Sequence, residues 1–243
     1  MGKTPHKRAL LIAGPTASGK SALALDVARN LNGVIINADA LQVYRELRIL
    51  TARPLEEELA QAPHRLYGHV PGSEGYTVAR WLQDVAQAIA DSWREGRLPI
   101  ITGGTGLYFR ALEKGLSSIP PVSQEIRDHW RSYDGDLHGE LAARDPEMAR
   151  RLRPQDRQRI VRALEVVETT GRSLLDWQQD VQAPPPLAGV EVERVFMEVP
   201  RDELYARAER RFDQMINAGA LGEVEKVITY DPALPMMKAI GLP

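Results

Sequence analysis

The stretch GPTASGKS, residues 14–21, constrains the fold more than any other part of the sequence. Gly14 and Gly19 are separated by four residues and are followed by Lys20 and Ser21, which is the Walker A spacing of a phosphate-binding loop. The apolar run ALLIAG, residues 9–14, predicts a buried strand directly before the loop, and residues 21–30 predict a helix directly after it. This context distinguishes a phosphate-binding loop from an accidental glycine-rich turn.

A loop of this kind directs backbone N–H groups and a helix N-terminus toward anionic oxygens. The predicted phosphate contacts are Gly14, Thr16, Ala17, Ser18, Gly19, Lys20 and Ser21. Lys20 adds a point charge, and the Ser21 hydroxyl is suited to a phosphate-bound Mg²⁺. The motif predicts phosphate binding, but it does not by itself identify the phosphate compound or predict phosphoryl transfer.

Strand patterns alternate with helix patterns along much of the chain. Apolar runs predict strands over 33–39, 98–106 and 192–199, and helical periodicity covers 76–95 and 202–217. This alternation predicts an α/β fold with a mainly parallel, doubly wound sheet flanked by helices, as in P-loop NTPases. Residues 113–188 contain no convincing buried strand and are bounded by prolines, which indicates a helical insertion. The predicted division is 1–112 (core, first part), 113–194 (insertion) and 195–243 (core, second part).

Composition excludes several classes of protein. The sequence has no cysteine, which excludes a disulfide framework and a cysteine nucleophile and fits a reducing compartment, so we expect a cytoplasmic protein. The apolar stretch near the N-terminus is short, so we expect neither a signal peptide nor a membrane span. No self-complementary apolar face is evident, and we expect a monomer.

One segment carries a strong local charge although the net charge is only −2. Residues 144–162 contain seven arginines and three acids. A basic patch of this kind is typical of a nucleic-acid surface, although an arginine-rich helix is also commonly a solvated face.

Asp39 is the only acid at the end of a predicted buried strand, where folds of this type bind ligands. It is interpreted as a metal-holding acid in a kinase-like protein, as a general base, or as a helix N-cap. Gln42, three residues later, either reads a base edge through its amide or completes a capping box. Spacing does not decide between these alternatives.

Five segments in order resemble one family: GPTASGKS, ADALQVYR, ITGGTGLYFRAL, QRIVRALEV with its trailing TG, and LYARAERRFDQMINAGALGEV. The chain resembles the tRNA dimethylallyltransferases, also called tRNA isopentenyltransferases. The resemblance implies a P-loop fold with a helical insertion. It also implies transfer of a dimethylallyl group from dimethylallyl diphosphate to the exocyclic amine of the adenine 3′ of the anticodon in tRNA.

The resemblance implies roles for individual residues. Asp39 and Thr105 match positions at the reaction centre, with Asp39 as the general base, and Arg207 and Arg211 match arginines near the diphosphate. The implied contacts to the tRNA anticodon stem-loop are Asp39, Ala40, Leu41, Gln42, Thr105, Arg127, Gln158, Arg159, Ile160, Val161 and Arg162. The implied cofactor is Mg²⁺, and the loop would hold the diphosphate of an isoprenoid rather than a triphosphate.

Two features depart from the family pattern. Ala40 stands where the family usually has serine, and the sequence given stops at PMMKAIGLP, where the family continues through a basic helical tail. We expect the shorter end to weaken tRNA binding more than diphosphate binding. The alternatives left open are a nucleotide kinase, an isopentenyltransferase acting on free adenine nucleotides, and a noncatalytic RNA-binding remnant.

Other candidate residues have structural explanations. His64 and His69 lack a third nearby ligand, so we expect structural or surface roles rather than a metal site. Trp130, Tyr133 and Trp177 either stack on RNA bases or, as helical spacing favours, pack in a core.

Overall fold

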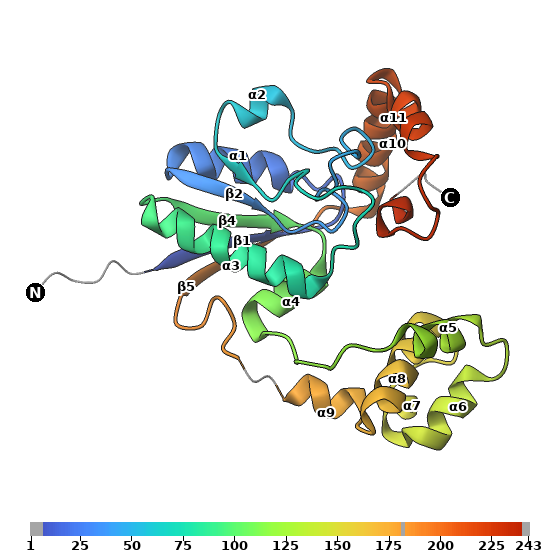
Figure 1. Ribbon diagram of the computed structural model, residues 1–243. Coiled ribbons are helices and arrows are strands. Elements are labelled where there is room, and N and C mark those ends of the chain that lie inside the picture. The colour runs from blue at the N-terminus through green and yellow to red at the C-terminus, as the bar shows by residue number, and fades with distance from the viewer. Residues whose placement is uncertain (1–6, 181–182, 240–243) are drawn as a thin grey trace, which may run out of the picture. The chain divides into compact units, whose positions relative to one another are not determined.

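A five-stranded parallel sheet forms the centre of the core in the computed structural model, which describes residues 7–180 and 183–239 (Figure 1). The strands are β1 (Arg8–Ala13), β2 (Gly33–Asn37), β3 (His64–Arg65), β4 (Leu98–Gly103) and β5 (Glu191–Phe196). Their order is β3-β2-β4-β1-β5, and every described pairing is parallel. The predicted parallel α/β sheet is thereby confirmed. β3 was missed because two residues are too few to establish a periodicity.

Helices cover both faces of the sheet: α1 (Lys20–Asn30) on one, and α3 (Val78–Arg94) and α4 (Gly106–Lys114) on the other (Figure 1). Successive strand residues point to opposite faces, so each strand serves both layers. Leu10, Ile12, Ile35 and Ile100 pack with α1, whereas Ala9, Leu11, Val34, Ile36 and Ile101 pack with α3 and α4. The apolar runs are continuous because both sides of these strands are buried.

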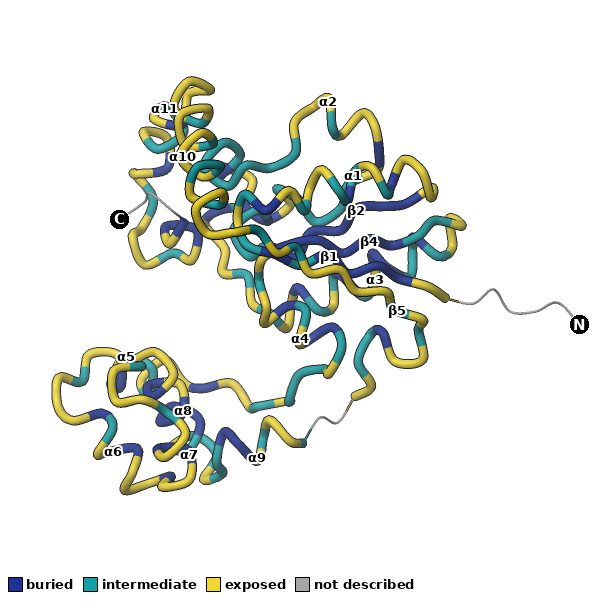
Figure 2. The backbone as a smooth tube through the Cα atoms, turned by 180° about the vertical axis from the view of Figure 1, so that it is seen from behind, coloured by how far each residue is buried: buried dark blue, intermediate teal, exposed yellow. Residues whose placement is uncertain are grey.

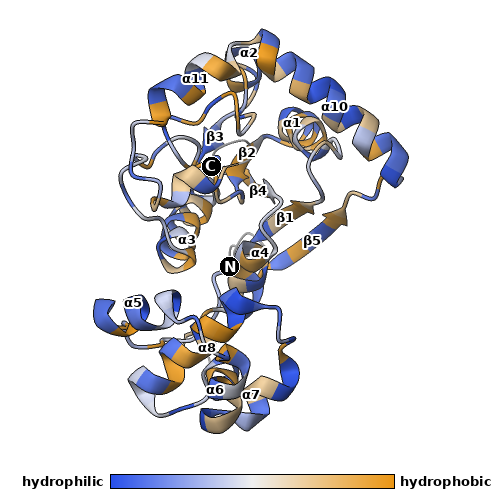
Figure 3. Cartoon of the chain, turned by 90° about the vertical axis from the view of Figure 1, so that its right-hand side faces the viewer, coloured by the Kyte–Doolittle hydropathy of each residue, from blue (hydrophilic) through white to orange (hydrophobic). Residues whose placement is uncertain are grey.

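Three more helices complete the core: α2 (Glu56–Leu59), α10 (Arg201–Asn217) and α11 (Ala220–Val227), followed by the 3₁₀ turn η1 (Pro235–Lys238). α10 contains no buried residue and is coloured mainly hydrophilic in Figure 3. Edge strand β5 is also mostly exposed, in contrast to the dark-blue central strands of Figure 2. β5 and α10 are therefore more exposed than the other elements of the core.

A second compact unit comprises residues 114–185. Its helices are α5 (Gln124–Ser132), α6 (Leu137–Arg144), α7 (Pro146–Arg151), α8 (Arg157–Thr170) and α9 (Leu174–Gln179). This is the predicted helical insertion, but its end lies earlier than the sequence-based boundary at 194, because β5 already belongs to the sheet. The second part of the core was predicted over 195–243, and its residues 240–243 lie outside the described residues.

Helix α8 is the centre of the insertion. The Asp156 side chain caps its first turn by accepting from the Arg159 N–H, and Gly171 caps its end in the left-handed conformation. Its buried side packs with Trp130, Leu141 and Leu174. The core interpretation of Trp130 is therefore confirmed.

No helix in the described ranges combines the length and the apolar character that crossing a membrane requires.

Trp81 of α3 is the largest fully buried side chain of the core. Its ring stacks on Tyr108 at 4.1 Å between centroids, and its indole N–H donates to the Asn37 carbonyl at 2.9 Å. We expect Trp81→Ala to lower the free energy of unfolding by about 3–5 kcal/mol, since it opens a cavity and leaves that carbonyl unpaired. Urea denaturation measures the loss. Trp93→Ala, at a partly exposed position of the same helix, should lose clearly less, and equal losses would contradict the assignment.

Candidate active site

The loop between β1 and α1 has the strained backbone of a tight phosphate loop. Ala17 and Gly19 have φ angles of 63° and 91°, and α1 begins directly after Gly19. Gly14 has no room for a side chain, because a Cβ there would lie 2.8 Å from the Met197 Cβ and 2.9 Å from the Ser18 Oγ. The first N–H groups of α1 have no intrahelical acceptors, so this end of the helix favours an anion.

A cavity of about 710 Å³ lies over the end of α1. Five cations line its wall: Lys20 from α1, Arg207 and Arg211 from α10, and Arg48 and Arg53 from the segment between β2 and α2. Arg207 and Arg211 are four residues apart and share one face of their helix. The predicted diphosphate-binding loop residues Ala17, Gly19, Lys20 and Ser21 also line this cavity.

The cations are partly removed from water. Burial lowers the pKa of the Lys20 ammonium; nearby Asp39 raises it in part, and Arg211 lowers it. The ammonium donates to the Pro15 carbonyl at 3.0 Å. Burial also lowers the pKa of Arg211, against the effect of Asp39 and Glu58, yet a guanidinium stays charged at neutral pH. Partly desolvated cations around a cavity attract a multiply charged anion more strongly than exposed cations do.

Asp39 follows β2 and is held by its neighbours in a turn. Its Oδ1 accepts from the backbone N–H groups of Leu41 at 2.9 Å and Gln42 at 3.4 Å. No helix begins there, so the helix N-cap and capping-box interpretations are wrong: the carboxylate caps a turn instead. Oδ2 accepts no hydrogen bond among the described residues, and it lies 4.0 Å from the position a Cβ would occupy on Gly104.

Asn37 fixes the backbone of Asp39 from below. This fully buried side chain accepts from the Asp39 N–H at 2.9 Å and donates to the Asp39 carbonyl at 2.9 Å and to the Leu66 carbonyl at 3.1 Å. A buried amide with all these bonds made rigidifies its surroundings. Asn37 was not predicted from the sequence, although a polar residue at the end of the apolar run GVII could have indicated a buried hydrogen-bonding role.

The second glycine-rich turn joins β4 to α4 and touches the Asp39 turn directly. Gly103 approaches so closely that a Cβ would lie 2.2 Å from the Ala38 carbonyl oxygen. The Thr105 hydroxyl accepts from the Ala40 N–H at 3.1 Å, and the Thr105 N–H donates to the Ala38 carbonyl at 3.2 Å. The structure thus brings Asp39 and Thr105 together, as the sequence predicts for the reaction centre.

Gln42 lines the same cavity as Lys20. Its amide nitrogen donates to the carbonyls of Thr51 at 2.8 Å and Ala52 at 3.1 Å. The amide nitrogen thus binds within the protein, and the amide oxygen Oε1 accepts no hydrogen bond among the described residues.

Two hydroxyl groups of the cavity wall, those of Thr102 and Ser21, are suited to a metal carried by a phosphate compound. Thr102 Oγ1, on the cavity wall at the end of β4, is buried and has no hydrogen-bond partner among the described residues. Ser21 lines the same wall, and the described residues contain no cluster of three or more acids or histidines for a resident metal. Mg²⁺ commonly takes most of its ligands from substrate phosphates and water. The residues fit a metal bound together with the substrate.

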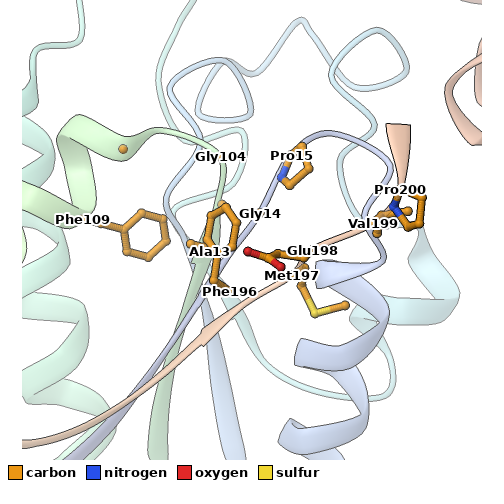
Figure 4. A pocket seen from close by; sticks show the side chains of 12 residues that line it. Ala13, Gly14, Pro15, Gly104, Phe109, Phe196, Met197, Glu198, Val199 and Pro200 are labelled. Atoms are coloured by element: carbon orange, nitrogen blue, oxygen red, sulfur yellow. The ribbon is translucent and has the colours of Figure 1, made fainter. Parts of the chain in front are cut away.

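A second cavity, of about 750 Å³, meets the loop at Gly14 and Pro15 (Figure 4). It is lined mainly by apolar groups, among them Phe109, Phe196 and Met197, and Glu198 is the one charged residue of its wall. Its lining contains no lysine or arginine, so a diphosphate is better accommodated in the cavity that Lys20 shares with Arg207 and Arg211.

The predicted RNA contacts of the insertion divide into two groups. Gln158, Arg159 and Arg162 are exposed and Arg127 is half-buried, whereas Ile160 and Val161 are buried in the core of the unit. The side chains of Ile160 and Val161 therefore pack in the core of the insertion, and the prediction that these side chains contact RNA is wrong. Several arginines of the basic segment already pair with acids: Arg144 with Glu140, Arg151 with Glu147, Arg159 with Asp156, and Arg162 with the buried Glu165.

His64 and His69 each contact a different group of the protein. His64 Nδ1 lies 2.8 Å from the Ala62 carbonyl oxygen, and His69 Nε2 lies 3.6 Å from an Asp84 carboxylate oxygen. Of the other aromatic candidates, Tyr133 and Trp177 pack against the core of the insertion.

A parallel sheet whose first strand enters a loop of this shape, with cations gathered over it, defines a P-loop α/β protein that binds a phosphate compound. Residues 42–243 match the family model described as IPP transferase. A tRNA dimethylallyltransferase of Azorhizobium caulinodans is 55% identical over 97% of this chain and 77% of that protein. One of Nitrobacter hamburgensis is 52% identical over 97% of the chain and 76% of that protein.

Solved structures agree. A eukaryotic dimethylallyltransferase acting on tRNA matches with a TM-score of 0.78 at 29% identity, over 92% of this chain and 56% of that one. The tRNA isopentenylpyrophosphate transferase of Bacillus halodurans matches with a TM-score of 0.64 at 31% identity, over 97% of this chain and 75% of that one. The chain belongs to the tRNA dimethylallyltransferase (IPP transferase) family.

Removal of the Asn37 amide tests the support beneath Asp39. We expect Asn37→Ala to lower the free energy of unfolding by about 2 kcal/mol or more, because it leaves buried backbone groups unpaired. Thermal or urea unfolding measures this. Asn30→Ala, on the exposed end of α1, is the control, and similar losses in both variants would refute the assigned role.

Proposed function

We propose that this protein transfers a dimethylallyl group from dimethylallyl diphosphate to the exocyclic amine of the adenine 3′ of the anticodon in tRNA. The observation that carries the proposal is the placement of one carboxylate, Asp39, beside a loop and cations suited to a diphosphate. Family membership supplies the reaction; the geometry supplies a role for each group.

The diphosphate is proposed to bind across the end of α1. Lys20, Arg207 and Arg211 neutralise its charge together with the N–H groups of residues 14–21. A divalent metal, proposed to be Mg²⁺ held by Ser21 and the diphosphate with Thr102 nearby, supplies further charge neutralisation when bound. Neutralising the leaving group promotes cleavage of the bond between the allylic carbon and oxygen.

The adenine amine attacks that allylic carbon as the diphosphate leaves, and Asp39 takes the proton that the amine releases. Because Asp39 Oδ1 is engaged by two backbone N–H groups, Oδ2 is the proposed proton acceptor. Thr105 holds the turn that carries Asp39. A base within a folded anticodon loop must leave its stack to reach such a cavity.

The insertion is proposed to bind the anticodon stem-loop through Gln158, Arg159, Arg162 and Arg127, whose side chains are exposed or half-buried. Contacts between basic side chains and phosphates supply much of the affinity of such complexes. The protein is also proposed to act as a monomer and in the cytoplasm, and the lack of cysteine fits the latter.

Transfer of labelled dimethylallyl to an anticodon stem-loop, with Mg²⁺ present, tests the function. We expect transfer by the wild type and a decrease of about 10²–10⁴-fold in kcat for Asp39→Asn, which keeps Oδ1 but lacks a base. Asp26→Asn, at an exposed position of α1, should retain activity. Transfer at the wild-type rate by Asp39→Asn would rule out the general base, and ATP turnover without RNA would favour a kinase.

Replacement of Arg211 tests the diphosphate site separately. We expect Arg211→Gln to weaken binding of dimethylallyl diphosphate about tenfold, since a partly desolvated cation is lost. Equilibrium binding without RNA measures the effect. Arg210→Gln, exposed on the same helix, should bind normally, so equal affinities of the two variants would contradict this assignment.

A further inference from the structure

A turn at residues 48–53 lies between α11 and the cavity of about 710 Å³ that Lys20 lines. The Arg53 N–H donates to the Arg48 carbonyl at 3.0 Å, and the Ala52 N–H donates to the Ile49 carbonyl at 2.9 Å. The Thr51 hydroxyl donates to the Leu47 carbonyl at 2.7 Å. This turn therefore resembles a single helical turn, with N–H groups at one end and carbonyls at the other.

Glu223 of α11 holds the N–H end of the turn. Its Oε2 accepts from the backbone N–H groups of Arg48 at 3.0 Å and Ile49 at 2.8 Å, and its Oε1 accepts from Leu50 at 3.0 Å. Three consecutive N–H groups thus converge on one carboxylate that comes from more than 170 residues later in the chain. Hydrogen bonds to an ionised carboxylate are stronger than those between neutral groups.

The carbonyl end of the turn holds Gln42. The carbonyls of Thr51 and Ala52 accept both donated bonds of the Gln42 amide nitrogen. The orientation of that amide, and with it the position of Oε1, is therefore set by the turn. Glu223 anchors this turn. Among the described contacts, no other side-chain carboxylate accepts from the N–H groups of residues 48–50.

We propose that Glu223 is a positioning residue for the acceptor adenine, acting through the 48–53 turn and Gln42. This inference rests on the proposed function. The exocyclic amine of adenine has two N–H groups, of which one meets Asp39 and the other meets Gln42 Oε1. A displaced turn rotates the Gln42 amide and misplaces the amine relative to Asp39. It leaves the phosphate loop in place, although it also moves Arg48 and Arg53, which line the same cavity.

The test compares Glu223→Gln with Glu225→Gln, an exposed position of the same helix. Glu223→Gln keeps the side-chain length but has one acceptor oxygen and no charge. We expect it to raise the KM for the anticodon stem-loop about tenfold and to lower the affinity for dimethylallyl diphosphate clearly less, since Lys20, Arg207 and Arg211 lie outside the turn. Glu225→Gln should resemble the wild type in both. An unchanged RNA KM in Glu223→Gln, or an equal loss of both affinities, would overturn the proposal.

A double-mutant cycle distinguishes positioning from general stabilisation. If Glu223 acts through Gln42, the effect of Glu223→Gln on the RNA KM disappears in a Gln42→Ala background. Independent effects that multiply would overturn the pathway.

Amide hydrogen exchange supplies a measurement that does not require activity. The backbone amides of residues 48–50 should exchange faster in Glu223→Gln and at the wild-type rate in Glu225→Gln. A wild-type chain that transfers nothing would refute the proposed function. In that case the RNA dissociation constants of the same variants judge the role of Glu223, and equal constants would refute it as well.

Discussion

The close contact between the carboxyl ends of β2 and β4 is the constraint on which the site depends. Gly103 lies against the Ala38 carbonyl, and Thr105 binds the backbone on both sides of Asp39, at Ala38 and Ala40. Because β4 pairs with both β2 and β1, the same contact sets the distance between the carboxylate and the phosphate loop. A side chain at Gly103 would push these strands apart and separate Asp39 from the phosphate loop.

Electrostatics then determines what this edge of the sheet can bind. The cations of α1 and α10 share one cavity, and burial lowers the pKa values of Lys20 and Arg211. A diphosphate adds the negative charge that this cluster lacks. Asp39 is near enough to raise the pKa values of both cations, so an acid lies beside a group of cations suited to an anion. This placement fits the proposed role of Asp39, which is to accept a proton as the anion departs.

Much of the fold followed from local pattern. The runs before and after Gly14–Ser21 and the two further apolar strands lie where their residues predict, because buried parallel strands leave strong signals. The boundary of the insertion was predicted less well: it ends earlier than 194, since β5, predicted over 192–199, begins at Glu191 and belongs to the sheet. Ile160 and Val161 belonged to a matching motif, but only packing revealed that their side chains are internal.

The sequence by itself determined the phosphate loop, the α/β sheet, the family and the place of Asp39 at the end of a strand, because each depends on residues adjacent in the chain or on motifs in a fixed order. Only the tertiary structure decided what supports them. Asn37, beside Asp39, also binds the Leu66 carbonyl, and Glu223 binds the 48–53 turn, through contacts between distant segments. Such contacts have no fixed spacing, so no local pattern predicts them.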